Sequence, residues 1–182
     1  QGGVLDLCVR FAGIEIIGSH KPLKGPSRPV SEGDLVHVLG ADFTVIEVPG
    51  HTLDHVAYAS VSDQFPGPVA FTGDTLFAAG CGRLFEGSAK DMFSSLRKIN
   101  QLPVNTEIYC AHEYTLANLN FAVVAEPNNE DTQKRQQQVS KMRAKGTATV
   151  PTTLELERRT NPFLRATTIA QLAERRFQKD QF

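Results

Sequence analysis

The sequence has 182 residues, of which 41% are hydrophobic, and a formal net charge of −1. This length and apolar content suffice for one or two domains with a hydrophobic core. The charge argues against a nucleic-acid-binding protein, because no basic surplus is available to neutralise phosphates. No apolar stretch reaches the length of about 18 residues that spans a bilayer, and no signal-peptide pattern is present, so we expect a soluble protein without membrane contact.

The three cysteines, Cys8, Cys81 and Cys110, are odd in number and form no Cys-x-x-Cys pair. Disulfide frameworks use paired cysteines in oxidising compartments. We therefore expect reduced cysteines and a cytoplasmic location. Cys81 lies between two glycines, which raises the alternative of a covalent nucleophile, but no matching base is evident in the sequence.

The first half of the chain alternates short apolar runs with turns. Residues 4–11 predict a short helix, and residues 14–17 predict a strand. Residues 20–29 hold three prolines and predict an irregular connection. Residues 35–39 and 43–48 flank a glycine-containing turn and predict a β-hairpin.

Further strands are predicted at residues 56–61, 69–72 and 107–110. Between the last two, apolar residues recur at helical spacing up to Ile99. Ser88, with Asp91 three residues later, resembles a capping box at the start of this helix.

The last seventy residues have a different pattern. Apolar residues at helical spacing follow Thr115, and residues 128–145 form a polar, charged segment that we interpret as a helix with a solvated face. Residues 152–159 and 167–180 predict two more helices. The chain is therefore expected to divide into a strand-rich part, residues 1–111, and an all-helical part, residues 112–182.

Three residues of the kind that bind metals follow predicted strands. His51 and His112 each come just after an apolar run, and Asp74 follows the run at residues 69–72. Taken singly, such residues are more often structural, but three side-by-side strands would bring them to one rim. Imidazole and carboxylate ligands suit zinc, iron or manganese, and a carboxylate can bridge two metal ions.

Several segments resemble glyoxalase II, the hydroxyacylglutathione hydrolase family of the metallo-β-lactamase superfamily. These are residues 49–55, 71–87, 110–115 and 161–165. The family's first motif, Thr-His-x-His-x-Asp-His, is not in the sequence, which opens at the point where that motif ends in relatives. The resemblance implies an α/β fold, an N-terminally truncated αββα sandwich, followed by a helical glutathione-binding domain. We expect the chain to be truncated directly after the motif.

The resemblance implies hydrolysis of the thioester S-D-lactoylglutathione to glutathione and D-lactate, a step of methylglyoxal detoxification, by a hydroxide held between two divalent metal ions. It assigns His51, Asp74 and His112 as catalytic metal ligands, with Asp74 as the bridge, and His55 as a supporting residue. Zinc is expected first, with iron or manganese possible in its place. A monomer with a small-molecule glutathione thioester as its partner is expected.

The resemblance also implies three substrate-binding residues. Arg165 is matched to the glycine carboxylate of glutathione, and Tyr114 and Arg83 to positions at the substrate site. Two positions depart from the family: Phe85 stands where some relatives have a tyrosine hydroxyl, and Asp54 stands where glycine is usual.

Two other functions stay open from the sequence. One is an iron enzyme of the same superfamily that oxidises glutathione persulfide, against which the helical tail and the motif at residues 161–165 argue. The other is an inactive glutathione-binding fragment, if the missing motif is absent from the protein. Thioester hydrolysis, oxygen consumption and glutathione binding without turnover distinguish the three.

Overall fold

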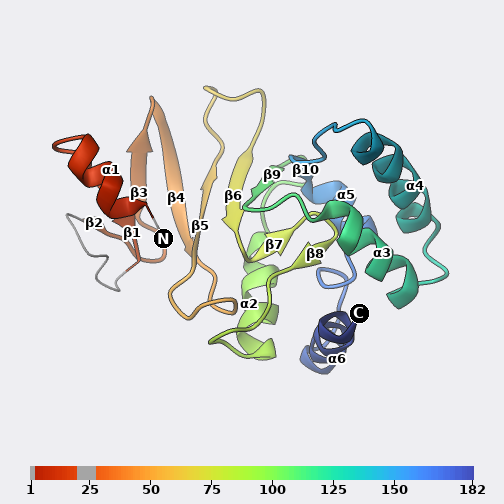
Figure 1. Ribbon diagram of the computed structural model, residues 1–182. Helices are drawn as coiled ribbons and strands as arrows, with labels where there is room; N and C mark the ends of the chain where they lie inside the picture. The colour runs from red at the N-terminus through yellow and green to blue at the C-terminus, as the bar shows by residue number, and fades with distance from the viewer. Residues whose placement is uncertain (1–2, 20–27) are drawn as a thin grey trace.

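The computed structural model describes residues 3–19 and 28–182. Its centre is a six-stranded mixed sheet with strand order β10-β9-β6-β5-β4-β3 (Figure 1). The pairings are antiparallel except that between β6 and β9, which is parallel. The strands are β3 (Leu35–Val38), β4 (Ala41–Glu47), β5 (Val56–Ser60), β6 (Val69–Gly73), β9 (Glu107–Cys110) and β10 (Thr152–Thr153). The predicted hairpin and the three later strands are confirmed.

Helix α2 (Ala89–Ile99) covers one face of the sheet (Figure 1). Its buried Met92, Leu96 and Ile99 recur at helical spacing and join a core with the sheet residues Ala70 and Ile108. The helix begins at Ser88, whose hydroxyl accepts a hydrogen bond from the Asp91 N–H while the Asp91 carboxylate accepts one from the Ser88 N–H. The predicted capping box is thus confirmed.

The opposite face of the sheet is also apolar. The rings of Phe43 and Phe71 lie 5.8 Å apart, and Phe71 stacks on Tyr109 at 5.3 Å. Phe65 packs edge-on against Phe43 at 5.9 Å. Apolar residues on both faces are typical of a sheet inside a layered sandwich, in agreement with the predicted α/β class.

The C-terminal part holds four helices: α3 (Thr115–Ala125), α4 (Glu130–Ala144), α5 (Leu154–Thr160) and α6 (Ile169–Gln181). Helices α3 and α4 pack against each other, and α6 packs beside α2. None of the helices within residues 3–19 and 28–182 is long and apolar enough to cross a membrane.

The prediction that this part is entirely helical is wrong at Thr152–Thr153, which form β10 at the edge of the sheet. The backbone N–H of Leu154 donates to the Thr106 carbonyl, which continues the attachment to the strand-rich part. A two-residue strand has no periodicity, and its partner β9 is distant in sequence, so nothing local signals it.

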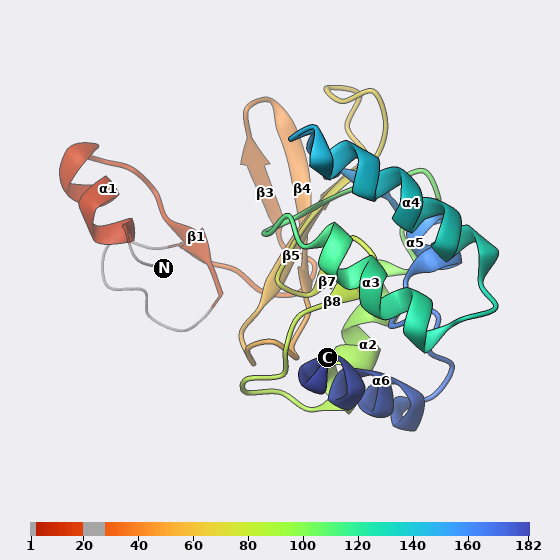
Figure 2. The same ribbon diagram turned by 45° about the vertical axis from the view of Figure 1, so that its right-hand side comes forward.

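The N-terminal residues form α1 (Val4–Arg10), with β1 (Ile17–Gly18) and β2 (Arg28–Pro29) in a small parallel pair. Figure 2 shows α1 projecting away from the main sheet, and none of its seven residues is buried. The strand predicted at residues 14–17 is reduced to its last residue and the glycine that follows. The predicted irregular connection lies largely outside the described residues, apart from Arg28 and Pro29.

A hairpin that sequence patterns did not predict follows Asp74. It consists of β7 (Leu76–Phe77) and β8 (Gly80–Cys81), joined by Ala78 and Ala79. Ala79 has a φ of 57°, in the left-handed region that favours glycine. The hairpin therefore depends on contacts from elsewhere in the molecule to hold this turn.

The capping box gives a testable prediction for stability. Ser88→Ala should lower the free energy of unfolding by about 1 kcal/mol, because the Asp91 N–H loses its acceptor. The matched control is Ser94→Ala on the same helix, whose exposed hydroxyl donates to the Lys90 carbonyl; it should change stability by less than about 0.5 kcal/mol. Urea unfolding of both variants measures the difference, and equal losses would contradict the capping role.

Candidate metal centre and adjoining pocket

His51 lies in the loop after β4 and is oriented by the backbone of a glycine-rich loop. Its Nδ1 is 2.9 Å from the carbonyl oxygen of Arg83. A carbonyl only accepts, so Nδ1 carries the hydrogen and Nε2 keeps a free lone pair. That Nε2 lies 3.9 Å from Oδ2 of Asp74. The tautomer is the one in which Nε2 can bind a metal ion.

Asp74 follows β6 and is held by His55. The Asp74 backbone N–H donates to Nε2 of His55 over 2.8 Å, so that ring must be neutral. Burial lowers the pKa of His55, which outweighs the opposing effect of the Asp74 carboxylate. Gly73, with a φ of 52°, allows this approach, because a Cβ there would lie 2.5 Å from Cε1 of His55. His55 thus holds the backbone of Asp74 in place.

His112 reaches the other side of the same carboxylate. Its Nε2 is 3.2 Å from Oδ1 of Asp74. The parallel pairing of β6 and β9 brings the ends of both strands to one edge, and the Ala111 N–H donates to the Gly73 carbonyl there. The imidazole stacks on Tyr114 with ring centroids 4.7 Å apart. The structure therefore brings His51, Asp74 and His112 together.

The donor set fits metal ions in kind and is divided into two halves. Imidazole nitrogen and carboxylate oxygen suit zinc, iron and manganese. His51 faces one oxygen of Asp74 and His112 faces the other, as around a bridging carboxylate. Within the described residues, no group of three or more His, Cys, Asp or Glu side chains is placed to hold one metal ion. Each half offers two donors, and a four-coordinate ion needs others in addition.

The loop after β8 closes directly over this centre. A Cβ on Gly82 would lie 2.0 Å from the Asp74 carbonyl oxygen and 3.2 Å from Nδ1 of His51. The Phe85 N–H donates to the His51 carbonyl over 3.1 Å. The Phe85 ring lies 4.8 Å from the imidazole of His51 and is 68% exposed. Glycine at position 82 is therefore required by close packing.

A pocket of about 770 Å³ extends from this centre towards α6. One end is formed by the two imidazoles and the carboxylate, and the other by cationic side chains. Its remaining walls are largely aromatic or small. The lining residues are His51, Asp74, Phe77, Cys81, Gly82, Arg83, Phe85, His112, Tyr114, Ala117, Asn118, Asn120, Arg176, Lys179 and Phe182.

Lys179 and Arg176 form the cationic end together with Arg83. The Lys179 Nζ donates to the Ala117 carbonyl over 3.0 Å and lies over the rings of Phe121 and Phe182. Burial, followed by the charges of Arg176 and Arg83, lowers the pKa of Lys179 to about 8. Asp180 offsets part of this charge, because its Oδ1 lies 2.9 Å from Arg176 and 3.6 Å from Arg83. The three cations still outnumber this one carboxylate, which favours an anion at this end.

Arg176 is buried and only partly satisfied by protein groups. Its guanidinium donates to the Cys81 carbonyl over 2.9 Å and to Asp180. The Arg176 Nε is buried and has no hydrogen-bond partner in the described part of the chain. A buried donor without an acceptor is costly, which fits a position that a ligand completes.

Arg165, assigned to the substrate from the sequence, lies elsewhere. Its Nε donates to Oε2 of Glu126 over 2.8 Å, and it lines a different pocket with Arg159 and Asp131. The neighbouring Phe163 is buried in the core, so the turn presents Arg165 to the end of α3. The structure does not bring Arg165 to the carboxylate and imidazoles.

Arg83 and Tyr114 do line the pocket, whereas Arg176 and Lys179 were missed from the sequence. The available signal was their spacing: Leu172, Arg176 and Lys179 recur on one face of α6, and Leu172 and Arg176 are buried. Basic residues that share the buried face of a helix are candidates for an anion site.

Cys81 contributes a wall of the pocket. Burial raises the pKa of its thiol to about 11, in spite of the nearby Arg176. A protonated, buried thiol is a poor nucleophile, which argues against the covalent alternative. Within the described residues, Cys8, Cys81 and Cys110 are all free of disulfide bonds.

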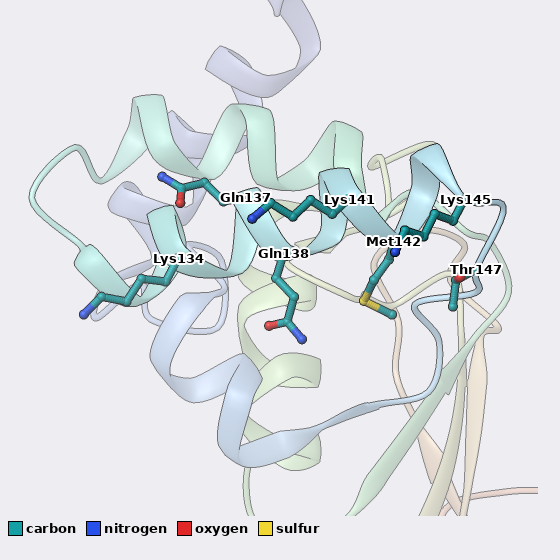
Figure 3. A pocket seen from close by; sticks show the side chains of 7 residues that line it. All are labelled: Lys134, Gln137, Gln138, Lys141, Met142, Lys145 and Thr147. Atoms are coloured by element: carbon teal, nitrogen blue, oxygen red, sulfur yellow. The ribbon is translucent and has the colours of Figure 1, made fainter.

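A separate hollow lies along α4, where the sequence predicted a solvated face. Figure 3 shows the side chains of Lys134, Lys141 and Lys145 spread along the helix, with Met142 directed towards Thr147. Among the described residues, no histidine, cysteine or carboxylate lines it. The pocket at Asp74 therefore remains the candidate site.

The family model for the metallo-beta-lactamase superfamily matches residues 6–112, and that for the hydroxyacylglutathione hydrolase C-terminus matches residues 113–182. A hydroxyacylglutathione hydrolase of Photobacterium profundum is 48% identical over 165 residues, which are 90% of this chain and 63% of that protein. The chain thus spans less than two thirds of the length of that relative.

Solved structures support the fold. The crystal structure of ETHE1 from Myxococcus xanthus has a TM-score of 0.68 at 24% identity, covering 96% of this chain and 62% of that one. TTHA1623, solved in a di-iron-bound form, has a TM-score of 0.56 at 24% identity, covering 89% and 70%. The expected fold class and the resemblance to glyoxalase II are confirmed. With one family match over more than half of its length, this chain belongs to the metallo-beta-lactamase superfamily, and residues 113–182 match the model of the hydroxyacylglutathione hydrolase C-terminus.

Proposed function

We propose that this chain belongs to a hydroxyacylglutathione hydrolase, a thioesterase that converts S-D-lactoylglutathione to glutathione and D-lactate in methylglyoxal detoxification. The observation that carries the proposal is one pocket with a carboxylate between two imidazoles at one end and three cations at the other. The substrate has a reactive thioester and negatively charged carboxylates, which match these two ends. A relative that is 48% identical to this chain over the 165 aligned residues bears this name.

Divalent metal ions, when bound, supply a Lewis acid for the thioester carbonyl and lower the pKa of a bound water to about 7. His51 and Asp74 would hold one ion, and Asp74 and His112 the other. Each ion would need further ligands beside these two donors. The structure of TTHA1623 with two irons supports a two-metal centre in this fold, and zinc remains the first expectation for this chain.

The chain's own residues orient the centre and the substrate. Neutral His55 fixes the Asp74 backbone, and the Arg83 carbonyl fixes the His51 tautomer. Within this proposal, residues 1–111 carry the metal-binding part, and residues 112–182 carry the glutathione-binding part together with His112. Tyr114 stands at the pocket, 50% exposed, and offers a phenol hydroxyl to the substrate.

The cationic end is proposed to hold the glutathione carboxylates. Arg83, Arg176 and Lys179 converge there, and charge-assisted hydrogen bonds to carboxylates are among the stronger protein contacts. Arg165 lines a different pocket and pairs with Glu126, so we assign it to positioning the end of α3. Phe85 lines the pocket with an apolar ring, so this position offers no hydroxyl group to the substrate.

The proposed bridging role of the Asp74 carboxylate gives a testable prediction. Asp74→Asn should lower kcat for S-D-lactoylglutathione by more than about 100-fold. Replacing residues that only hydrogen-bond to metal ligands already lowers activity by about 10–100-fold. Elemental analysis should show that the variant loses bound metal. The control is Asp63→Asn, an exposed carboxylate in the β5–β6 loop, which should leave activity and metal content unchanged.

Retention of full activity and metal by Asp74→Asn would refute the bridge. If the unaltered protein instead consumed oxygen with glutathione persulfide and left the thioester intact, that result would favour the oxidoreductase alternative over the proposed function.

Substitution of Lys179 and of Arg165 tests which of these two cations binds the substrate carboxylate. Lys179→Met should raise KM by about 10–100-fold, because a charge-assisted hydrogen bond contributes about 1.5–3 kcal/mol, while kcat changes little. Arg165→Met should leave KM within about twofold, although it breaks the ion pair with Glu126. Steady-state kinetics on both variants decides the assignment, and the reverse pattern would return the carboxylate contact to Arg165.

The lowered pKa of Lys179 predicts a pH dependence. The pKa of Lys179 is about 8, so the ammonium is charged and attracts a carboxylate when the pH is below this value. At a higher pH the neutral amine does not attract it. KM should therefore rise as the pH increases from about 7 to 9. Lys179→Arg should abolish this rise, because a guanidinium stays charged throughout. A KM that is equally pH-dependent in Lys179→Arg would exclude Lys179 as its origin.

A further inference from the structure

The β7–β8 hairpin next to Asp74 is held by side chains from the C-terminal helices. The Ala79 N–H, in the left-handed turn, donates to Oε2 of Glu157 over 2.8 Å. Asn161 Nδ2 lies 3.1 and 3.0 Å from the carbonyl oxygens of Phe77 and Gly80 and 2.8 Å from Oε2 of Glu157, so its two hydrogens are shared among these three acceptors. Asn118 Nδ2 donates to the Ala78 carbonyl at 3.0 Å. Four successive residues of the hairpin thus bond to the helical part.

Glu157 is the centre of this attachment. Its side chain is fully buried, with 0% exposed. Oε1 accepts from Arg135 at 2.7 Å and from Thr152 at 2.8 Å, and Oε2 accepts from Ala79 and from Asn161, both at 2.8 Å. A buried charge is tolerated only when it is paired and its lone pairs are satisfied. Half of the hydrogen bonds to this carboxylate hold the hairpin or its Asn161 partner.

The hairpin in turn shapes the pocket. Phe77 packs edge-on against His112 at 5.9 Å and against Tyr114 at 5.6 Å. The Cys81 carbonyl receives Arg176, and Gly82 lies against Asp74. Displacement of the hairpin would therefore alter the metal-binding end and the cationic end together.

We propose that Glu157 is a positioning residue for this site, because its buried carboxylate holds the Ala79 amide and fixes the β7–β8 hairpin between Asp74 and Arg176. Glu157 itself does not line the pocket. The effect on turnover rests on the proposed thioesterase function, whereas the effect on the hairpin does not.

The test uses Glu157→Gln, which keeps the shape but replaces one acceptor oxygen by a donor. Whichever way the amide is oriented, its NH2 meets either Arg135 and Thr152 or Ala79 and Asn161. We expect kcat to fall by about 10–100-fold, as for other supporting residues. Amide hydrogen exchange in residues 74–82 should become at least about tenfold faster.

The matched control is Arg158→Met on the same helix. Arg158 also joins α5 to the strand-rich part, through Asn100 and the Leu102 carbonyl, but away from the hairpin. This variant should lose thermal stability yet keep kcat and the exchange rates of residues 74–82 within about twofold. Equal effects of Glu157→Gln and Arg158→Met on exchange would show a general loss of stability and overturn the proposal.

A double variant, Glu157→Gln with Arg135→Met, provides a rescue. Without the guanidinium, the glutamine NH2 can donate to the Thr152 hydroxyl while its oxygen accepts from Ala79 and Asn161. We expect kcat and hairpin protection within about threefold of the unaltered protein, even if Glu157→Gln alone does not fold. A folded double variant that lacks hairpin protection would overturn the proposal, and protection without thioesterase activity in the unaltered protein would refute only the proposed function.

Discussion

The parallel pairing of β6 with β9 determines where the functional groups meet. Asp74 and His112 follow these two strands, and parallel neighbours end at the same edge of the sheet. His51 lies in the loop after β4, and its imidazole is oriented by a hydrogen bond to the Arg83 carbonyl. The carboxylate then lies between two imidazoles, each with access to a different oxygen. Neutral His55, which accepts from the Asp74 N–H, completes a preorganised set of donors, as the proposed metal-dependent hydrolysis requires.

The helical part contributes more than a lid over this edge. It supplies the cations Arg176 and Lys179, an edge strand of the sheet, and the buried Glu157 that bonds to the β7–β8 hairpin. The proposed metal-binding and anion-binding ends are therefore parts of one packed unit. A charged group buried at such a junction is expensive unless every lone pair is satisfied, and Glu157 meets that condition with four donors.

Local patterns predicted the strands before His51, Asp74 and His112 because each apolar run ends at a turn, and they predicted the capping box because it lies within four residues. The β7–β8 hairpin could not be predicted in this way, since its turn depends on Glu157, which is 78 residues from Ala79. Arg165 was chosen for its motif, but the direction of its guanidinium is set by Glu126, which directly follows α3. Tertiary contacts of this kind leave no periodic signal in the sequence.

Asp74 is proposed to join two metal ions, one held with His51 and one with His112. Anomalous diffraction at the metal absorption edges, from crystals of the purified and catalytically active protein, tests this bridge. Two anomalous peaks should flank the Asp74 carboxylate, one beside Nε2 of His51 and the other beside Nε2 of His112. A single peak, or metal bound away from Asp74 in a protein that hydrolyses the thioester, would contradict it.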